Sequence, residues 1–479
     1  MKTLMGLLLV LTTAGWAAAL QAPFATEDVP ISSHDRVYAA DQTSNTVSVI
    51  DPANNRLLGV IRLGNPVSAS LSPLYPGELL VHGLGYSPDG TTLAVVSVGS
   101  NSVTLIDTST NSIKGVVYVG RAPHEAFFTP DGGEIWVTVR GEDYVSVIDP
   151  VAIEETLRIQ LANGPGMTMF SPDGTYGFVC SSFTPKLAVV EVQSHRVVKR
   201  IPQVSPFCPN IAVSPENDEV WFTLKDVGDV QVFSAKPPFD PIAVLETGPI
   251  TNHVNFANNR NGKFAYVTVG GLNEVQVYRR GGAQPELVTT IPVGPLPHGV
   301  WPSGDGTRVY VALENGGAAA AIDTIENRVI ADIPIGQTTQ ALVYVPNAVP
   351  DGSGTQNLMP PGVAAETAKL QLVGTGGESG AQATVAVNSL GLIDLLQIAA
   401  SGLNPHTVYL LWLADTNRPP FGSLVPIGMI TPFPDGGAVA QTIGPLKSVA
   451  PPGTELFPKR FLVVTEEGSQ EPVLFETEN

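Results

Sequence analysis

Segments of about 42 to 45 residues resemble one another between Arg36 and Ala348, and this repeat restricts the folds open to the chain. A stretch that alternates apolar and polar residues with a period of two, such as VSVID ending at Asp51, follows a valine-rich stretch in each segment, and such alternation predicts a β-strand. A spacing in this range is typical of propeller blades or solenoid units. The seven copies of the valine-rich stretch are RVYAAD from Arg36, LAVVSV from Leu93, IWVTV from Ile135, YGFVC from Tyr176, VWFTL from Val220, AYVTV from Ala265 and VYVAL from Val309.

Each repeat has the pattern of four strands. The valine-rich strand is followed by one that ends near an acidic residue (VSVID to Asp51), by a third such as LLGVIRLG, and by a short apolar strand before an SPDG-like turn. One four-stranded sheet cannot bury both of its apolar faces, so we expect seven sheets to stack in a closed ring. The chain enters on the second strand of a blade at Arg36, and the innermost-type strand QALVYVP starts at Gln340. We therefore expect the last strand to complete the first blade.

These repeats resemble a known family. Tyr266-Val267-Thr268-Val269 nearly spells the YVTN signature, and the repeats resemble the YVTN-type seven-bladed β-propeller family over about two thirds of the chain. The resemblance implies an all-β propeller over residues 36–348. That family includes binding proteins, lactonases, lyases and redox proteins, so the resemblance does not imply one function.

The composition changes after the propeller. Residues 349–363 are rich in Pro, Gly, Ser and Asn, which predicts a linker. Residues 364–479 contain short apolar or alternating strands separated by Gly and Pro, which predicts a small antiparallel β-sandwich. The patterns GLNPHTVYLLWLAD and FLVVTEE resemble the extracytoplasmic sandwich of anti-sigma-K factors. We interpret this part as an accessory or adhesion module.

The N-terminus and the net charge limit the location and the partners. Residues 1–22 contain Lys2, an apolar run and a cluster of alanines, which predicts a secretory signal peptide and a periplasmic or secreted protein. No later apolar stretch is long enough for a transmembrane anchor. The 25 Lys and Arg residues against 44 Asp and Glu give a net charge of −19, which disfavours nucleic acid as a partner.

The two cysteines, Cys180 and Cys208, fall at the same end of neighbouring predicted blades. Export to an oxidising compartment favours a disulfide between them. The alternative is a thiolate ligand beside the channel.

Polar residues fall at the predicted channel mouth. Aligning the repeats on the SPDG-like turn places one residue at the start of each innermost strand: His82, His124, Gly166, Pro209, His253, His298 and Gln340. Imidazoles that point into one space can bind Cu, Zn, Mn or Fe, and Gln340 can add a carbonyl oxygen. The arrangement is similar to the histidine sites of nitrous-oxide reductase and oligogalacturonate lyase propellers, which implies a metal. The alternatives are histidines that tie neighbouring strands together by hydrogen bonds, or that contact a ligand directly.

Charged residues in loops on the same face are further candidates. Glu142 or Glu314 could act as a general base beside a metal-bound water. Arg121 and Glu125 flank His124 and could orient its imidazole or pair with each other. Other charged residues of these loops, which are more often simply solvated, are Arg140, Asp143, Lys225 and Asp226.

Two classes of function remain open. The first is an exported propeller that binds a protein, a carbohydrate or a small molecule on the histidine-bearing face. The second is a metal-dependent lyase or oxidoreductase. The sequence leaves open whether the chain is an enzyme.

Overall fold

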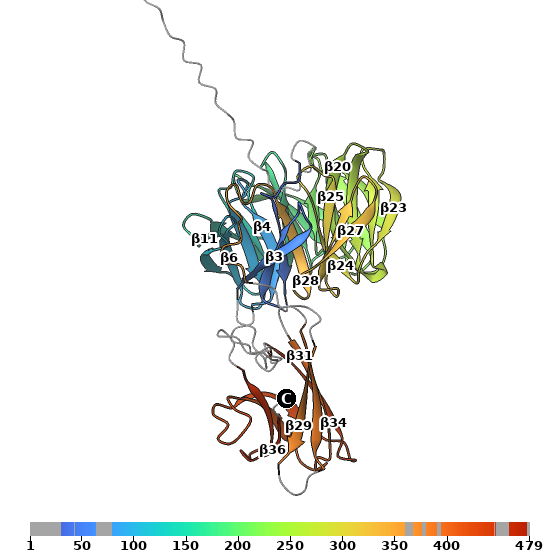
Figure 1. Cartoon of the computed structure of the whole chain (residues 1–479). Coiled ribbons are helices and arrows are strands. Elements are labelled where there is room, and N and C mark those ends of the chain that lie inside the picture. Colours follow the sequence, from blue (N-terminus) through green and yellow to red (C-terminus); the bar gives the residue numbers. More distant parts are fainter. Residues whose placement is uncertain are drawn as a thin grey trace, which may run out of the picture.

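The computed structural model describes residues 30–42, 44–63, 79–359, 367–375, 380–389, 394–444, 446 and 459–476. The predicted signal peptide lies outside these residues. The described chain forms β-strands and one short 3-10 turn, η1 (Gly270–Leu272). Figure 1 shows a ring of sheets, coloured blue to yellow, and a second sheet region coloured orange to red.

The ring consists of seven four-stranded antiparallel sheets, as predicted. The innermost strands of blades 1 to 7 are β28 (Thr339–Val345), β4 (Val81–Tyr86), β8 (Pro123–Phe128), β12 (Pro165–Phe170), β16 (Ile211–Val213), β20 (Thr251–Asn259) and β24 (Pro297–Pro302). The second strands are β1 (Arg36–Asp41), β5 (Thr92–Ser97), β9 (Ile135–Val139), β13 (Tyr176–Ser181), β17 (Glu219–Leu224), β21 (Gly262–Val269) and β25 (Arg308–Leu313).

The outer half of each blade is a hairpin. The third strands are β2 (Thr46–Asp51), β6 (Ser102–Asp107), β10 (Tyr144–Asp149), β14 (Lys186–Glu191), β18 (Asp229–Ser234), β22 (Glu274–Arg279) and β26 (Ala318–Asp323). The outermost strands are β3 (Arg56–Arg62), β7 (Ile113–Tyr118), β11 (Glu154–Gln160), β15 (Arg196–Pro202), β19 (Pro241–Glu246), β23 (Glu286–Pro292) and β27 (Arg328–Pro334).

The ring closes within blade 1, as the sequence predicted. β28 from the end of the propeller pairs antiparallel with β1 from its start, with Val37 opposite Tyr344. All seven residues of β28 are buried. The Tyr344 hydroxyl donates a hydrogen bond to Asp35 (2.5 Å), and the Thr339 hydroxyl donates to Asp41 (2.8 Å). Closure therefore depends on contacts between the two ends of the repeat region.

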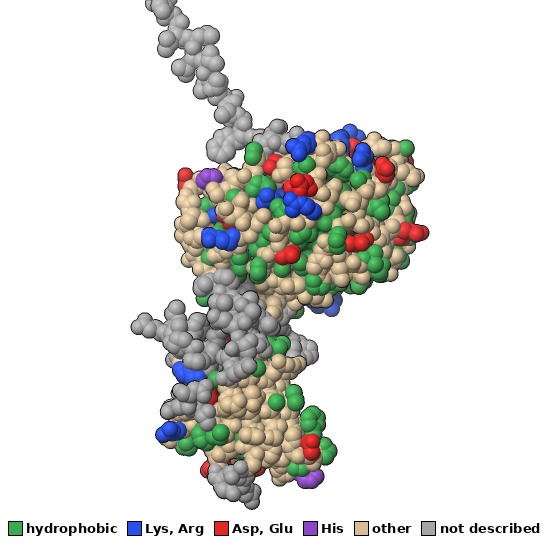
Figure 2. Space-filling view, turned by 45° about the vertical axis from the view of Figure 1, so that its right-hand side comes forward, with side chains coloured by type: hydrophobic (Ala, Val, Ile, Leu, Met, Phe, Trp, Pro, Cys, Tyr) green, Lys and Arg blue, Asp and Glu red, His purple; other side chains and the backbone are tan. Residues whose placement is uncertain are grey.

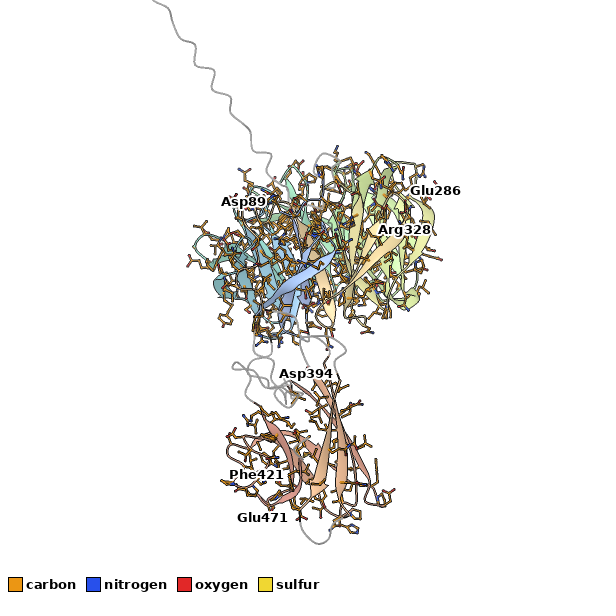
Figure 3. All side chains as sticks on the ribbon, viewed as in Figure 1. Asp89, Glu286, Arg328, Asp394, Phe421 and Glu471 are labelled. Atoms are coloured by element: carbon orange, nitrogen blue, oxygen red, sulfur yellow. A yellow bond between two sulfur atoms is a disulfide. The ribbon has the colours of Figure 1, made fainter. Side chains whose placement is uncertain are left out.

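The two faces of the ring differ. On the turn face, the innermost strands end in SPDG-like turns, and the Ser87 hydroxyl and Thr91 N–H donate to Asp89 (2.5 and 3.0 Å; Figure 3). Such local hydrogen bonds stabilise the turn. On the opposite face, which we call the mouth face, the innermost strands begin. The histidines of the predicted ring lie there.

Aromatic side chains fill the space between blades and along the axis. Trp136 packs edge-on against Phe170 of the next blade, with ring centroids 5.0 Å apart. Phe127 of blade 3 stacks on Trp301 of blade 7 (6.4 Å), although these blades are not neighbours in the ring. Tyr86 of blade 2 contacts the same indole. These three buried rings form an aromatic floor across the axis below the mouth.

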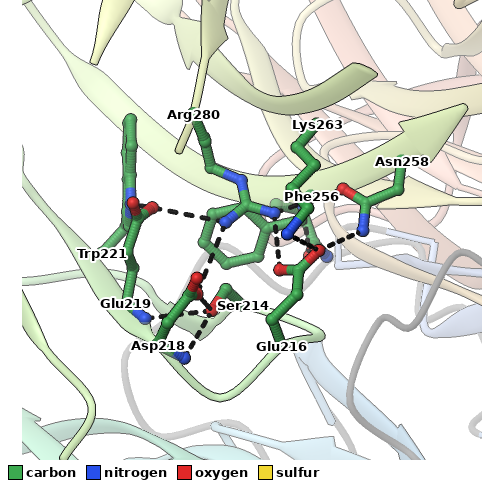
Figure 4. Close-up of polar contacts among 10 residues, drawn as sticks. Ser214, Glu216, Asp218, Glu219, Trp221, Phe256, Asn258, Lys263 and Arg280 are labelled. Carbon is green, nitrogen blue, oxygen red and sulfur yellow. Dashed lines mark hydrogen bonds and ion pairs between the residues drawn. The ribbon is translucent and has the colours of Figure 1, made fainter. Parts of the chain in front are cut away.

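A buried arginine joins blades 5 and 6 on the turn face (Figure 4). The Arg280 side chain is 1% exposed, and its guanidinium pairs with Glu216 (3.0 Å) and Glu219 (3.3 Å). It also donates to the Asn258 side chain and lies 4.5 Å from the Phe256 ring centroid. Charge, hydrogen bonds and a cation–π contact thus hold one guanidinium between two sheets.

The segment after the ring follows the propeller before it leaves. Val349 and Ala348 are buried, and Met359 forms a β-bridge with Val60 of β3. The Asn111 amide donates to the carbonyls of Gly354 and Gln356. Part of the predicted linker 349–363 therefore contacts the propeller, and residues 360–363 lie outside the described ranges.

The C-terminal region is an eight-stranded antiparallel sheet in the order β33-β32-β35-β36-β29-β30-β31-β34. Its two edges approach each other, because Thr442 of β34 donates to the Ile427 carbonyl of β33 (2.6 Å), so the sheet is nearly closed around its own apolar core. The predicted strands are confirmed. Their bounds are β29 (Thr367–Gly374), β30 (Gln382–Ser389), β31 (Asp394–Ser401), β32 (Tyr409–Ala414), β33 (Val425–Ile430), β34 (Ala438–Gly444), β35 (Phe461–Glu466) and β36 (Pro472–Glu476).

The surface gives little further indication of a partner. Acidic and basic side chains are interspersed over the face drawn in Figure 2, without a large field of one sign. Among the described residues, no helix has the length and apolar character needed to cross a membrane.

Candidate functional site

The mouth of the channel brings the predicted polar residues together. His82, His124, His253, His298 and Gln340 lie at the starts of innermost strands, and each is between 3% and 7% exposed. The histidines form two pairs. The ring centroids of His82 and His124 are 4.4 Å apart, and those of His253 and His298 are 4.7 Å apart. Gly166 starts the next innermost strand after His124, and Pro209 precedes that of blade 5.

A β-bulge shapes each of these strand starts. In β8 the register jumps between Pro123 and Ala126, so two residues, His124 and Glu125, stand opposite the single residue Thr138. A bulge leaves an extra residue unpaired and re-aims the neighbouring side chains. The same register shift occurs in the innermost strands of blades 2, 6 and 7. In blades 3 and 6, where neither bulge residue is glycine, two consecutive side chains can therefore contribute to the mouth.

The bulge corrects the register assigned to His253. The residue of blade 6 that matches His82, His124 and His298 is Asn252, and His253 occupies the second bulge position, which Glu125 holds in blade 3. The sequence alignment was one residue off because blade 6 has no SPDG turn: β20 continues to Asn259, which pairs with Gly262. The bulge nevertheless keeps His253 beside His298.

Hydrogen bonds to neighbouring blades fix the imidazole tautomers. The Nδ1 atoms of His124 and His298 lie 2.6 Å from the carbonyls of Gly166 and Gln340, so each Nδ1 carries the hydrogen and donates. The Asn210 amide receives the Val254 N–H on its oxygen (2.8 Å) and donates to His253 Nδ1 (3.3 Å). The hydrogen of His253 is therefore on Nε2, which has no partner among the described residues. These contacts show that histidines of the mouth join neighbouring blades by hydrogen bonds, which was one of the alternatives considered for them.

Arg140 and Glu125 enter the same space. The Arg140 guanidinium donates to His124 Nε2, so both ring nitrogens of His124 are engaged. The Glu125 carboxyl is buried, and its Oε1 lies 4.0 Å from Nδ1 of His82. Neither of these two atoms has a hydrogen-bond partner among the described residues, and the same is true of Arg140 Nε. Buried polar atoms without partners indicate a place for a water, an ion or a ligand.

Burial sets the protonation of the mouth. Burial, together with the smaller effect of the charges of Lys225 and Arg140, lowers the pKa of His253 to about 3. The pKa values of His82, His124 and His298 also lie well below the usual range, chiefly through burial. Burial raises the pKa of Glu125 to about 8 despite the opposing charge of Arg140. At neutral pH the imidazoles are uncharged, and the positive charge of the mouth comes from arginine and lysine.

The two charged residues that flank His124 in the sequence, Arg121 and Glu125, do not form the contacts expected of them. Arg121 does not pair with Glu125: it forms a surface ion pair with Glu142 (2.8 Å). Glu314 acts electrostatically on Lys225, whose pKa is lowered mainly by burial. Sequence reasoning missed the contact of Glu125 with His82. An acidic residue within the apolar strand PHEAFF was the available signal.

The disulfide between Cys180 and Cys208 is present, with Cα atoms 6.0 Å apart. It anchors the loop before β16, where the Cys208 N–H also donates to the Ser181 carbonyl (2.9 Å). Phe207 of this loop lies against the Arg140 guanidinium, with Cζ 5.8 Å from the ring centroid. The disulfide thus positions one wall of the mouth, and the thiolate alternative is wrong.

Replacing both Cys180 and Cys208 by alanine should lower the free energy of unfolding by about 3–4 kcal/mol, because the bond closes a loop with a sequence separation of 28. Urea denaturation measures this loss. Wild-type protein unfolded in the presence of a reductant should show the same loss. A change below about 1 kcal/mol would contradict the stabilising role of the bond.

The buried histidines should make the propeller sensitive to acid. Because the pKa of His253 is about 3 in the folded chain and near 6.5 when unfolded, the unfolded state binds more protons between these values, and stability falls as pH drops. His253→Gln should reduce the slope of unfolding free energy against pH by up to about 1.4 kcal/mol per pH unit between about pH 5 and 4. Denaturant titrations at several pH values measure the slope. His406→Gln, at an exposed position, should leave it unchanged; equal slopes for both variants would contradict the assignment.

Comparison with known proteins identifies the fold. No known protein-family profile and no curated protein sequence matches the chain. A structure of Kuenenia stuttgartiensis hydrazine synthase superimposes with a TM-score of 0.52 at 18% identity, over 66% of this chain and 99% of that one. A functionally unknown protein from Desulfotomaculum acetoxidans superimposes with a TM-score of 0.54 at 11% identity, over 64% and 98%.

These likenesses define a class by architecture. The chain contains a seven-bladed β-propeller, and at these identities the similarity extends to the fold alone. The resemblances to the YVTN repeat family and to the anti-sigma-K sandwich stay predictions.

Proposed function

We propose that this chain is an exported propeller protein that binds a small anionic ligand, such as a carboxylate or another oxyanion, at the channel mouth. The observation that carries the proposal is the Arg140 guanidinium held inside the mouth, with Nε buried and unpartnered within the described chain. The predicted signal peptide and the disulfide support export.

The surroundings of Arg140 favour an anion. Lys225 adds a second positive charge, and the imidazoles are uncharged. The Lys225 ammonium makes no hydrogen bond or ion pair within 4 Å among the described residues. The raised pKa of Glu125 leaves that carboxyl largely protonated near neutral pH, so it does not neutralise the guanidinium. The mouth is therefore locally positive, although the net charge of the whole chain is −19. An oxyanion would accept charge-assisted hydrogen bonds from Arg140 and from Nε2 of His253.

A metal site is the second candidate, because donor atoms of His82, His124 and Glu125 lie within 4.8 Å of one another. Imidazole and carboxylate suit Zn, Cu, Mn or Fe. However, both nitrogens of His124 are engaged, and a metal ion would have to displace the Arg140 guanidinium, whose charge repels it.

The metal-dependent enzyme would use the wider set His82, His124, His253, His298 and Gln340. Of its two candidate bases, Glu142 pairs with Arg121 at the surface, and Glu314 lies near Lys225. These contacts make the anion the better supported ligand.

Arg140→Met separates the two candidates. Anion binding predicts that acetate or sulfate, titrated by calorimetry, binds the wild type and that the variant loses about tenfold or more in affinity, because a charged hydrogen-bond donor is removed. Arg121→Met is the matched control, since Arg121 is an exposed arginine of the same face, and its affinity should equal that of the wild type. Elemental analysis of the same samples tests the metal: a stoichiometric metal that increases in Arg140→Met and disappears in His82→Ala would contradict the anion site.

A further inference from the structure

Exposed apolar side chains gather on one half of the mouth face. Each side chain is 37–57% exposed, and each lies on a different loop of blades 4, 5 and 6. The described mouth-face loops of the other blades hold no large hydrophobic side chain of comparable exposure. We call these residues the apolar arc: Phe183, Val204, Val227, Ile250 and Leu272.

The loops of the apolar arc are continuous. Each is hydrogen-bonded to the next one around the ring, so the five side chains stand on one connected rim. The four bonds are Gln203 N–H to Pro185 O (3.1 Å), Ser205 hydroxyl to the Asp226 carboxylate, Gly248 N–H to Gly228 O (3.0 Å) and Gly270 N–H to Ile250 O (2.8 Å).

The apolar arc begins where the two cationic side chains lie. Phe207 shares its loop with Val204, and its ring packs against Arg140. The Phe207 carbonyl accepts the backbone N–H of Lys225 (3.0 Å), and Val227 follows Lys225 by two residues. A charged centre and an apolar surface therefore meet within two bonded loops. In these five loops the charged residues are Lys225 and Asp226, and Asp226 is bonded to Ser205.

From this juxtaposition we infer that the ligand is an amphipathic acid: a monocarboxylate whose head binds beside Arg140 and Lys225 and whose aliphatic tail lies on Phe207, Val204 and Val227. The inference rests on the proposed anion site and specifies its substrate class. The positive charge matches the head, and the adjoining apolar rim removes the tail from water, which supplies affinity in proportion to the area covered.

A series of acids tests the inference. Acetate, hexanoate and decanoate, kept below micelle-forming concentrations, are titrated into the full chain by calorimetry. Affinity should rise about fourfold for each methylene group that the rim buries. Decanol, which has the tail without the charge, should bind more weakly than decanoate by about tenfold or more.

Variants of the rim separate tail from head. Val227→Ser and Val204→Ser should each weaken decanoate binding by several-fold to about tenfold and leave acetate binding unchanged, because only the tail contacts these side chains. Val151→Ser is the control: Val151 is 90% exposed on a turn of the opposite face, and its replacement should change neither affinity.

The outcomes distinguish this inference from the proposed function. If acetate and decanoate bind equally, the anion site stands and the amphipathic ligand is overturned. If decanol binds as tightly as decanoate, the charged head is not recognised, which also overturns it. If no acid binds the wild type, or if Arg140→Met binds the acids as tightly as the wild type, the anion site itself fails.

Discussion

A chain that ends at residue 338, before β28, should not fold cooperatively. The truncation removes β28, the strand that closes the ring, and exposes the edge of β1 with which β28 pairs. Leu342, Val343, Tyr344 and Val345 are all buried, and losing the burial of four such side chains costs roughly 6–12 kcal/mol, which is comparable with the whole stability of a typical domain.

Calorimetry and near-ultraviolet circular dichroism measure this effect. A chain that ends at residue 359 is the control, because it keeps β28 and the bridge between Val60 and Met359. The control should unfold in one sharp transition, and the shorter chain should show none. A sharp transition of the shorter chain near that of the control would contradict the role of β28.

Arg280→Met should lower the free energy of unfolding by about 3–5 kcal/mol, the cost of removing one partner from a buried ion pair. Without the guanidinium, Glu219 loses its cation between blades 5 and 6, and Glu216 keeps only its ion pair with Lys263 (3.1 Å). Urea denaturation of the wild type and the variant measures the difference.

Arg279→Met is the matched control, because Arg279 is the adjacent residue and is exposed. Its replacement should change stability by less than about 0.5 kcal/mol. Equal losses in the two variants would show that the effect comes from removing any positive charge in this acidic protein. A loss below about 1 kcal/mol in Arg280→Met would contradict the buried network.

Much of the propeller could be predicted from the sequence because each blade repeats the same pattern of strands and turns. A period-two pattern, renewed about every 43 residues, fixes strand, turn and blade boundaries independently of the other blades. The closure by β28, the disulfide and the gathering of the histidines follow from counting within this repeat, and the structure bears them out.

The details of the mouth could not be predicted in this way. A β-bulge adds one unpaired residue without disturbing the alternation on either side, so the sequence pattern does not reveal it. This bulge places Glu125 near His82 and makes Asn252, instead of His253, the equivalent of His298. The stacking of Trp301 on Phe127 across the axis depends on the diameter of the closed ring, which the sequence pattern does not specify.

The sequence by itself determined the architecture: seven blades, a shared first blade, a C-terminal antiparallel sheet and histidines at one end of the channel. The tertiary structure decided which charges meet there. Arg140 and Lys225 come from loops of blades 3 and 5, and Phe207 joins them from the loop between blades 4 and 5. Contacts between loops of different blades depend on loop conformation, which no periodic pattern specifies. The strands, in contrast, follow from a local residue pattern that is present in every repeat.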